Sequence, residues 1–247
     1  MSLLVLLLWL AVTYTLLFLF RFLLISRFSG LALLIFNRPG LGVTLFNILL
    51  FPGVIIHELS HFLMAAMLNV PTGKITIFPH QDEGEQRLGS VQIAHTDPLR
   101  ESLIGGAPLV TASVSLVALA HWQFPGLFTS APTLTQIIPP LSHLQTWIWF
   151  YAVFTLSNTM FTSKSDRRAW PFLIGLFVLT FIIFYALNLV KPIQVPVINF
   201  FAATVTQLNI AFTLTIAVDL GIIFLLILIE KLVSLLTGRH LRFNPSW

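Results

Sequence analysis

Two histidines and a glutamate stand within five residues of one another, in the stretch His57-Glu58-Leu59-Ser60-His61 of an otherwise apolar segment. Ionisable side chains are costly inside hydrocarbon, so three of them together indicate a functional site. On a helix, residues i and i+4 lie on one face, which places the two imidazoles about one turn apart. Two ring nitrogens arranged in this way can bind a single Zn²⁺ ion. The alternative is a pair of helix histidines that only hydrogen-bond to their neighbours.

Glu58 is placed to do chemistry beside that ion. It is rotated by about 100° from His57 around the helix axis, so its carboxylate flanks the metal without having to bind it. There it can accept a proton from water that the metal activates. Two metal-binding histidines and a neighbouring general base are the parts of the His-Glu-x-x-His motif of zinc metalloproteases. The sequence therefore predicts a zinc site at His57 and His61, with Glu58 as the general base and acid.

A catalytic zinc needs a third protein ligand, and the residues alone leave its identity open. Outside the motif and the segment 69–102, the acids of the chain are Asp166, Asp219 and Glu230. The remaining histidines are His80, His95, His121, His143 and His240. Asp219 lies alone in an apolar run, where it needs a partner such as the zinc, a ligand histidine or a polar group on another helix. Glu230 stands next to Lys231 and is expected to face water.

The composition indicates that these residues belong to a membrane protein. Hydrophobic residues make up 57% of the 247-residue chain and charged residues only 9%, whereas soluble domains carry about 25% charged residues. The chain has no cysteine, which excludes disulfides and thiolate zinc sites. The net charge is +4, but the basic residues lie at the ends of apolar runs. That distribution is typical of membrane topology, so the expected partner is the lipid bilayer and not nucleic acid.

Six apolar runs approach the roughly 20 residues that a membrane-spanning helix needs. They are Leu3–Leu24, Leu41–Leu68, Leu103–Trp122, Trp147–Phe161, Pro171–Val190 and a part of Phe200–Leu236. We therefore expect an all-α polytopic membrane protein with about six transmembrane helices, folded as one domain over residues 1–247. The segment Gly30–Phe36 is a candidate for a short interfacial or re-entrant piece.

One segment between the second and third runs has a different pattern. Residues 69–102 hold five of the nine acids, and within them Lys74–Phe78 and Ser90–His95 alternate between polar and apolar residues. The residues between these two stretches are rich in turn formers. This pattern predicts a small β-hairpin at the membrane surface, between the second and third transmembrane helices.

Basic residues in the loops favour a cytoplasmic N-terminus. That orientation places nine of them on the cytoplasmic side, namely Lys74, Arg87, Arg100, Lys164, Arg167, Arg168, Lys231, Arg239 and Arg242. The four on the other side are Arg21, Arg27, Arg38 and Lys191. By the positive-inside rule, we expect a multi-pass protein of the cell membrane with its active site toward the cytoplasm.

The spacing of two later polar residues extends the pattern. Asn158 lies near the end of the fourth apolar run, and Asp166 follows it by eight residues. Together with the helical His-Glu-x-x-His motif, this arrangement resembles the site-2 proteases, a family of intramembrane zinc metalloproteases. The family pairs that motif with a distant Asn-Pro-containing motif that ends in Leu-Asp-Gly. Gly106-Ala107-Pro108, which opens the third run, is also similar to a small-residue and proline element of the family.

The resemblance covers about residues 41–170 and carries several implications. It implies that Asp166 is the third zinc ligand, that the substrates are transmembrane segments of other proteins, and that Asn158 holds the substrate backbone. An alternative for Asn158 is a hydrogen bond between helices. Phe161 stands where the family has proline, and Ser165-Asp166-Arg167 replaces Leu-Asp-Gly, so the role of Asp166 is inferred from its spacing.

Two other functions remain open at this point. One is a multi-span zinc protease of the prenyl-protein-processing type, which takes its third ligand from a glutamate on a later helix and would therefore use Glu230. The other is a non-catalytic protein that binds or transports a metal, or an inactive relative of the protease that only holds helical partners. The altered second motif is the feature that favours this last reading.

Overall fold

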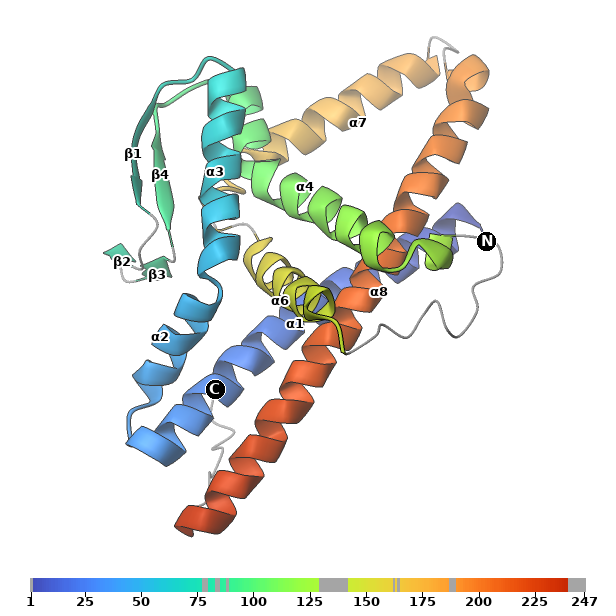
Figure 1. Ribbon diagram of the computed structural model, residues 1–247. Helices are drawn as coiled ribbons and strands as arrows, with labels where there is room; N and C mark the ends of the chain where they lie inside the picture. The colour runs from blue at the N-terminus through green and yellow to red at the C-terminus, as the bar shows by residue number, and fades with distance from the viewer. Residues whose placement is uncertain are drawn as a thin grey trace.

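The computed structural model describes residues 2–76, 80–82, 85–87, 89–128, 142–161, 163, 165–186 and 190–239, with the backbone alone for 80–82, 85–87, 181, 185 and 190–194. Most of these residues are helical (Figure 1). The helices are α1 (Leu3–Phe36), α2 (Pro39–Leu49), α3 (Phe51–Met67), α4 (Pro98–Gln123), α6 (Leu144–Thr159), α7 (Trp170–Ala186) and α8 (Val190–Thr237), with a short 3₁₀ helix, η1, at Pro125–Phe128.

Three helices are long and apolar enough to cross a membrane: α1, α4 and the Val195–Thr237 part of α8. The pair α2 and α3 counts as a fourth candidate if the two helices together form one bent span. The chain is therefore a multi-pass membrane protein with three to four candidate spans in its described part. Helices α6 and α7, with 16 and 17 residues, are shorter than these.

The second predicted span is broken instead of continuous. Helices α2 and α3 meet at Leu50 with an angle of 61° between them. Pro52 lies in the first turn of α3 and has no N–H to donate to the carbonyl of Ile48, so the helical hydrogen bonding is interrupted where the chain bends. The segment Gly30–Phe36 is not a separate re-entrant piece, because it forms the last two turns of α1.

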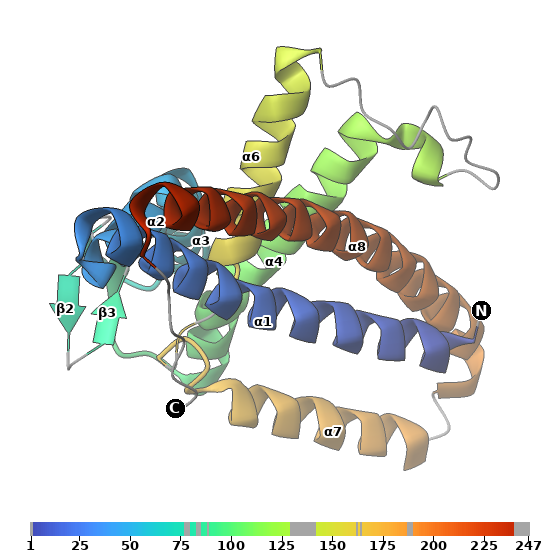
Figure 2. The same cartoon turned by 90° about the horizontal axis from the view of Figure 1, so that it is seen from below.

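Helices α1 and α8 lie side by side and run in the same direction (Figure 2). The Asn209 amide of α8 donates to the carbonyl of Leu6, near the N-terminal end of α1, at 3.0 Å. Farther along both helices, the Arg27 guanidinium donates to the Glu230 carboxylate at 2.9 Å. Two parallel spans require an odd number of crossings between them. The prediction of six spans, which makes the first and last helices antiparallel, therefore does not fit this packing.

The predicted hairpin is present between α3 and α4. Strand β1 (Thr72–Thr76) pairs antiparallel with β4 (Ser90–Ile93), and the short strands β2 (His80–Asp82) and β3 (Glu85–Arg87) pair between them. The connecting residues 77–79, 83–84 and 88 lie outside the described residues. The hairpin runs beside α3, the helix that carries the His-Glu-x-x-His motif (Figure 1).

The second half of helix α6, from Val153 to its end, is buried, and α6 packs against α3, α4 and α8. Trp149 is among the largest fully buried side chains, and its indole N–H donates to the Leu119 carbonyl of α4. Because protein and not lipid surrounds this second half, it can hold polar side chains such as Ser157 and Asn158. The C-terminal end of this helix is one wall of the site described next.

Candidate active site

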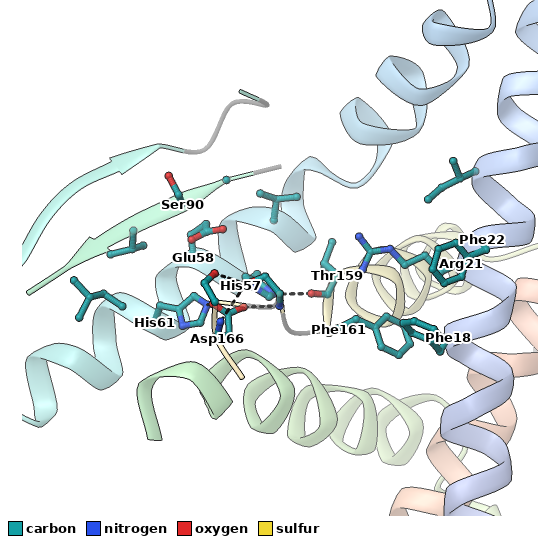
Figure 3. Close-up of a pocket in the computed structure, with 17 residues that line it drawn as sticks. Phe18, Arg21, Phe22, His57, Glu58, His61, Ser90, Thr159, Phe161 and Asp166 are labelled. Carbon is teal, nitrogen blue, oxygen red and sulfur yellow. Dashed lines mark hydrogen bonds and ion pairs between the residues drawn. The ribbon is translucent and has the colours of Figure 1, made fainter. Parts of the chain in front are cut away.

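A cavity of about 360 Å³ lies between α1, α3, strand β4 and the residues that follow α6 (Figure 3). This volume is within the range of small-ligand sites. His57, Glu58, His61 and Asp166 all contribute to its wall, so the cavity contains the four residues that were predicted to carry the chemistry. Glu58 is 6% exposed.

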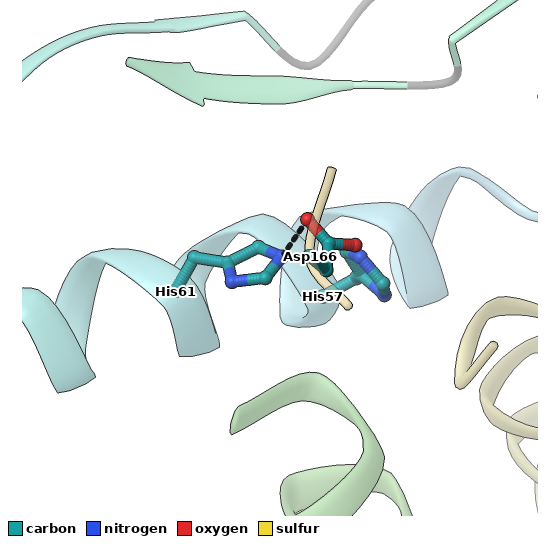
Figure 4. A group of neighbouring side chains, drawn as sticks. All are labelled: His57, His61 and Asp166. Atoms are coloured by element: carbon teal, nitrogen blue, oxygen red, sulfur yellow. Dashed lines mark ion pairs between the residues drawn. The ribbon is translucent and has the colours of Figure 1, made fainter. Parts of the chain in front are cut away.

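The three predicted metal ligands come together in this wall. One ligand atom from each of His57, His61 and Asp166 lies within 4.8 Å of the other two (Figure 4). The Nε2 atom of His61 is 3.7 Å from Oδ1 of Asp166. Two imidazoles and one carboxylate are a common donor set for a catalytic zinc, which leaves a fourth position for water or substrate. The donor set therefore fits a zinc ion.

Hydrogen bonds fix the tautomer of both histidines. Nδ1 of His57 is 2.6 Å from the Thr159 carbonyl, and Nδ1 of His61 is 2.8 Å from the Ile104 carbonyl. A carbonyl oxygen can only accept, so each Nδ1 carries the proton and donates it. Each Nε2 therefore keeps a lone pair for a metal, which is the usual arrangement of zinc-binding histidines.

Both carbonyls are available because their own helices do not use them. Thr159 is the last residue of α6, and the final carbonyls of a helix have no partner within it. Ile104 lies four residues before Pro108 inside α4, and proline has no N–H to donate to that carbonyl. The element Gly106-Ala107-Pro108 thus has a physical role in the site, because it frees the acceptor that orients His61.

Asp166 belongs to the loop between α6 and α7, and α4 holds this loop in place. The Ser163 backbone N–H donates to Oδ2 of Asp166 at 2.6 Å, which orients the carboxylate. The Ser102 hydroxyl of α4 donates to the Ala169 carbonyl at 2.7 Å. The Asp166 backbone carbonyl packs directly on Gly105, where a Cβ atom would collide with it. The close approach of loop and helix therefore requires glycine at position 105.

Strand β4 lies close to the proposed general base. A Cβ atom at Gly89, the residue before β4, would lie 2.8 Å from Oε1 of Glu58. Ser90, Val91 and Ile93 of β4 also line the cavity. The hairpin therefore forms the wall of the cavity that faces Glu58 (Figure 3).

The rival third ligands lie elsewhere. Asp219 of α8 is 1% exposed and accepts a hydrogen bond from the Asn158 amide at 3.3 Å. Glu230 is 8% exposed and pairs with Arg27, so the expectation that it faces water is wrong. Within the described part of the chain, the carboxylate that joins His57 and His61 in a possible metal group is that of Asp166. Neither Asp219 nor Glu230 therefore belongs to this group.

Asn158 lies beside the site and not in its wall. It is 1% exposed, and its amide contacts Asp219 and the Phe154 carbonyl. In this conformation it joins α6 to α8, which is the alternative reading given above. Its predicted contact with a substrate backbone stays a prediction.

Three participants were not found by sequence reasoning: Thr159, Ile104 and Arg21. The first two act through backbone carbonyls, which no side-chain pattern reveals, although the proline four residues after Ile104 is a usable signal. Arg21 lines the cavity from α1. Its position as a lone arginine within a predicted span is a signal of function, but the loop-charge count treats it as a loop residue.

Comparisons with protein-family models, with curated proteins and with solved structures give no match for this chain. The functional conclusion therefore rests on the residues and geometry of the site.

Proposed function

We propose that this chain is an intramembrane zinc metalloendopeptidase. The observation that carries the proposal is the convergence of His57, His61 and Asp166 within 4.8 Å, in a cavity that also contains Glu58. A metal group without a neighbouring base would fit a storage or structural role equally well. The buried carboxylate of Glu58, one residue from a ligand, favours hydrolysis.

Each residue of the site has a separate role in the proposed peptide hydrolysis. Zinc at such a site supplies Lewis acidity, which polarises a peptide carbonyl and makes water a stronger nucleophile. Glu58 takes a proton from the attacking water and returns it to the leaving amine. The carbonyls of Thr159 and Ile104 hold the two imidazoles in their metal-binding tautomer. Asp166 completes the donor set.

The substrates proposed are transmembrane segments of other proteins. A peptide bond inside a helix is hydrogen-bonded and shielded, so a substrate must unwind before water can attack it. Strand β4 lines the cavity, and an extended segment could add to the hairpin as a further strand. For the topology we propose five crossings, by α1, the bent pair α2–α3, α4, α6 and α8. With the N-terminus in the cytoplasm, the hairpin and the loop 160–169 then face the cytoplasmic side of the cell membrane.

The test is zinc content followed by proteolysis. Purified wild type, Asp166→Asn and Asp219→Asn are compared by elemental analysis in detergent, because both substitutions are isosteric and differ only in their distance from the histidines. We expect about one zinc per chain in wild type and in Asp219→Asn, and a large loss in Asp166→Asn. Wild type should then cleave a transmembrane reporter, while Glu58→Gln retains zinc and is inactive.

Two results would contradict this proposal. Loss of zinc in Asp219→Asn alone would move the third ligand to α8. A wild-type protein that binds no zinc when supplied with it, or binds zinc and cleaves no transmembrane reporter, would favour a non-catalytic membrane protein.

A further inference from the structure

Arg21 places a positive charge in the cavity wall opposite the metal-binding residues. It lies on α1 between Phe18 and Phe22, which also line the cavity, and its guanidinium points toward Thr159 and His57 (Figure 3). Its neighbours in α1 are almost all apolar. An ionisable side chain in such a helix is costly and indicates a function that requires it.

The guanidinium has no anionic partner among the described residues. Its recorded contact is with the Phe161 ring, whose centroid is 5.9 Å from Cζ. A guanidinium has five N–H donors in a planar fork that matches a carboxylate. The Asp166 carboxylate is turned toward His61 and the Ser163 N–H instead. The donors of Arg21 are therefore directed at the space that a ligand would fill.

The charges of the cavity favour an anionic ligand. The ionisable residues in its wall are Arg21, Glu58 and Asp166, together with the two histidines, which are neutral when they bind a metal. A divalent ion and Arg21 bring three positive charges against two carboxylates. Among the residues that line the cavity, one positive charge would then have no counterion.

The rest of the cavity wall is apolar on the side of Arg21. Phe18 is 43% and Phe22 57% exposed, and Ile25 continues this surface along α1. On the opposite side, Val91 and Ile93 of β4 add further apolar contact. A ligand that matches these surfaces is mostly apolar and carries one anionic group, as does a membrane segment with a single acidic residue.

We propose that Arg21 is an anion-binding subsite that selects substrates with an aspartate or glutamate side chain close to the scissile bond. This proposal rests on the proposed proteolytic function, because the bound peptide is a substrate only if the chain is a protease. The carboxylate lies close to the scissile bond because Arg21 and the metal ligands share one cavity of about 360 Å³, which holds only a few residues. Arg21 acts on binding, and the chemistry remains with Glu58.

The test measures binding without cleavage. Zinc-loaded Glu58→Gln protein in phosphatidylcholine nanodiscs is titrated with labelled leucine–alanine transmembrane peptides that carry one Glu, or one Gln, at successive positions. At one or two positions the Glu peptide should bind about tenfold tighter than the Gln peptide, as expected for a charge-assisted pair. Adding Arg21→Gln should remove the preference and Arg21→Lys should keep part of it. Arg38→Gln, a control at the exposed start of α2, should leave it unchanged.

The outcomes separate this proposal from the proteolytic function. An equal preference with and without Arg21, or no peptide binding at all, overturns the subsite. Peptide binding that depends on Arg21 only in discs with anionic phospholipid, and equally for Glu and Gln peptides, assigns Arg21 to a lipid phosphate instead. A Glu preference that depends on Arg21 in a protein that never cleaves keeps the subsite and removes the protease. Zinc content, measured for every variant, shows that each site remains assembled.

Discussion

At the scale of single residues, the metal group depends on backbone atoms as much as on side chains. The carbonyls of Thr159 and Ile104 orient the two imidazoles, and the carbonyl of Asp166 rests on Gly105. Such outer contacts commonly change metal affinity by about 10–100-fold when they are lost. A backbone carbonyl cannot be mutated away, so its contribution has to be tested through the residues that make room for it.

Gly105 offers such a test, with Gly106 as its matched control. An alanine at 105 would collide with the Asp166 carbonyl, whereas a Cβ atom at 106 meets nothing within 4 Å. Gly105→Ala should therefore displace Asp166 and lower both zinc content and proteolysis at least tenfold. Gly106→Ala should leave both unchanged. Equal zinc content in the two variants, measured by elemental analysis, would show that the Asp166 loop does not need this close contact.

The local part of the site could be predicted from the sequence, and the distant part could not be derived from the residues alone. His57, Glu58 and His61 lie on little more than one helical turn, so their spacing fixes their geometry once the segment is helical. Asp166 lies 105 positions after His61 and reaches it only through the packing of α4 against the loop. The residues left Asp219 as a rival and Glu230 as a weaker candidate, and the folded chain brings Asp166 alone of these three acids to the two histidines.

At the scale of the elements, α4 is the support of the site. It supplies the Ile104 carbonyl to His61, the surface of Gly105 to the Asp166 loop and the Ser102 hydroxyl to Ala169. Asp97 begins this helix, because its carboxylate accepts the Arg100 backbone N–H at 3.1 Å. That hydrogen bond holds the pKa of Asp97 below its ordinary value. One helix therefore positions two of the three proposed metal ligands.

Pro108 is the residue that gives α4 this role. Pro108→Ala should restore the helix hydrogen bond to the Ile104 carbonyl and so compete with His61 for that acceptor. We expect the zinc dissociation constant, measured by competition with a chelating dye, to rise about tenfold. Pro98→Ala, in the first turn of the same helix where no carbonyl is freed, serves as the control. An unchanged constant in Pro108→Ala would mean that His61 keeps its orientation without this proline.

The elements themselves were predictable to different degrees. The hairpin followed from its alternating residues and the turn formers between them, although the burial of its two longer strands does not alternate. The break between α2 and α3 was missed because apolar composition is continuous across it, and only Pro52 interrupts the hydrogen bonding. Helix α6 was predicted as a span, and with 16 residues it is shorter than the candidate spans α1, α4 and α8, so its crossing remains part of the proposed topology.

At the scale of the whole molecule, the parallel packing of α1 and α8 changes the topology that the loop charges suggested. If α8 crosses in the same direction as α1, Lys231 and Arg239 leave the cytoplasmic side. At least two of the nine basic residues assigned to the cytoplasm then lie on the other side, so the charge asymmetry that favoured this orientation becomes smaller. The positive-inside rule uses only the charges of the loops, so it cannot predict which helices pack together in the folded protein.

Because the chain has no cysteine, single introduced cysteines can report this topology directly. We expect Ser2→Cys and His95→Cys to react with a membrane-impermeant maleimide from one side of sealed vesicles, and Leu236→Cys from the other. These positions start α1, follow the hairpin and end α8. Labelling of all three from the same side would restore an even number of crossings and contradict the parallel arrangement.

The attachment of α1 to α8 also decides which wall of the cavity can give way. Two hydrogen bonds join α1 to α8 along its length, from Asn209 to Leu6 and from Arg27 to Glu230. The α1 wall of the cavity is therefore fixed to the rest of the protein. The hairpin opposite is a two-stranded sheet, and a sheet of that size has little stability of its own. In the proposed protease, entry of a helical substrate would therefore require outward displacement of the hairpin, and the lifetime of that open form would limit how often Glu58 meets a new peptide bond.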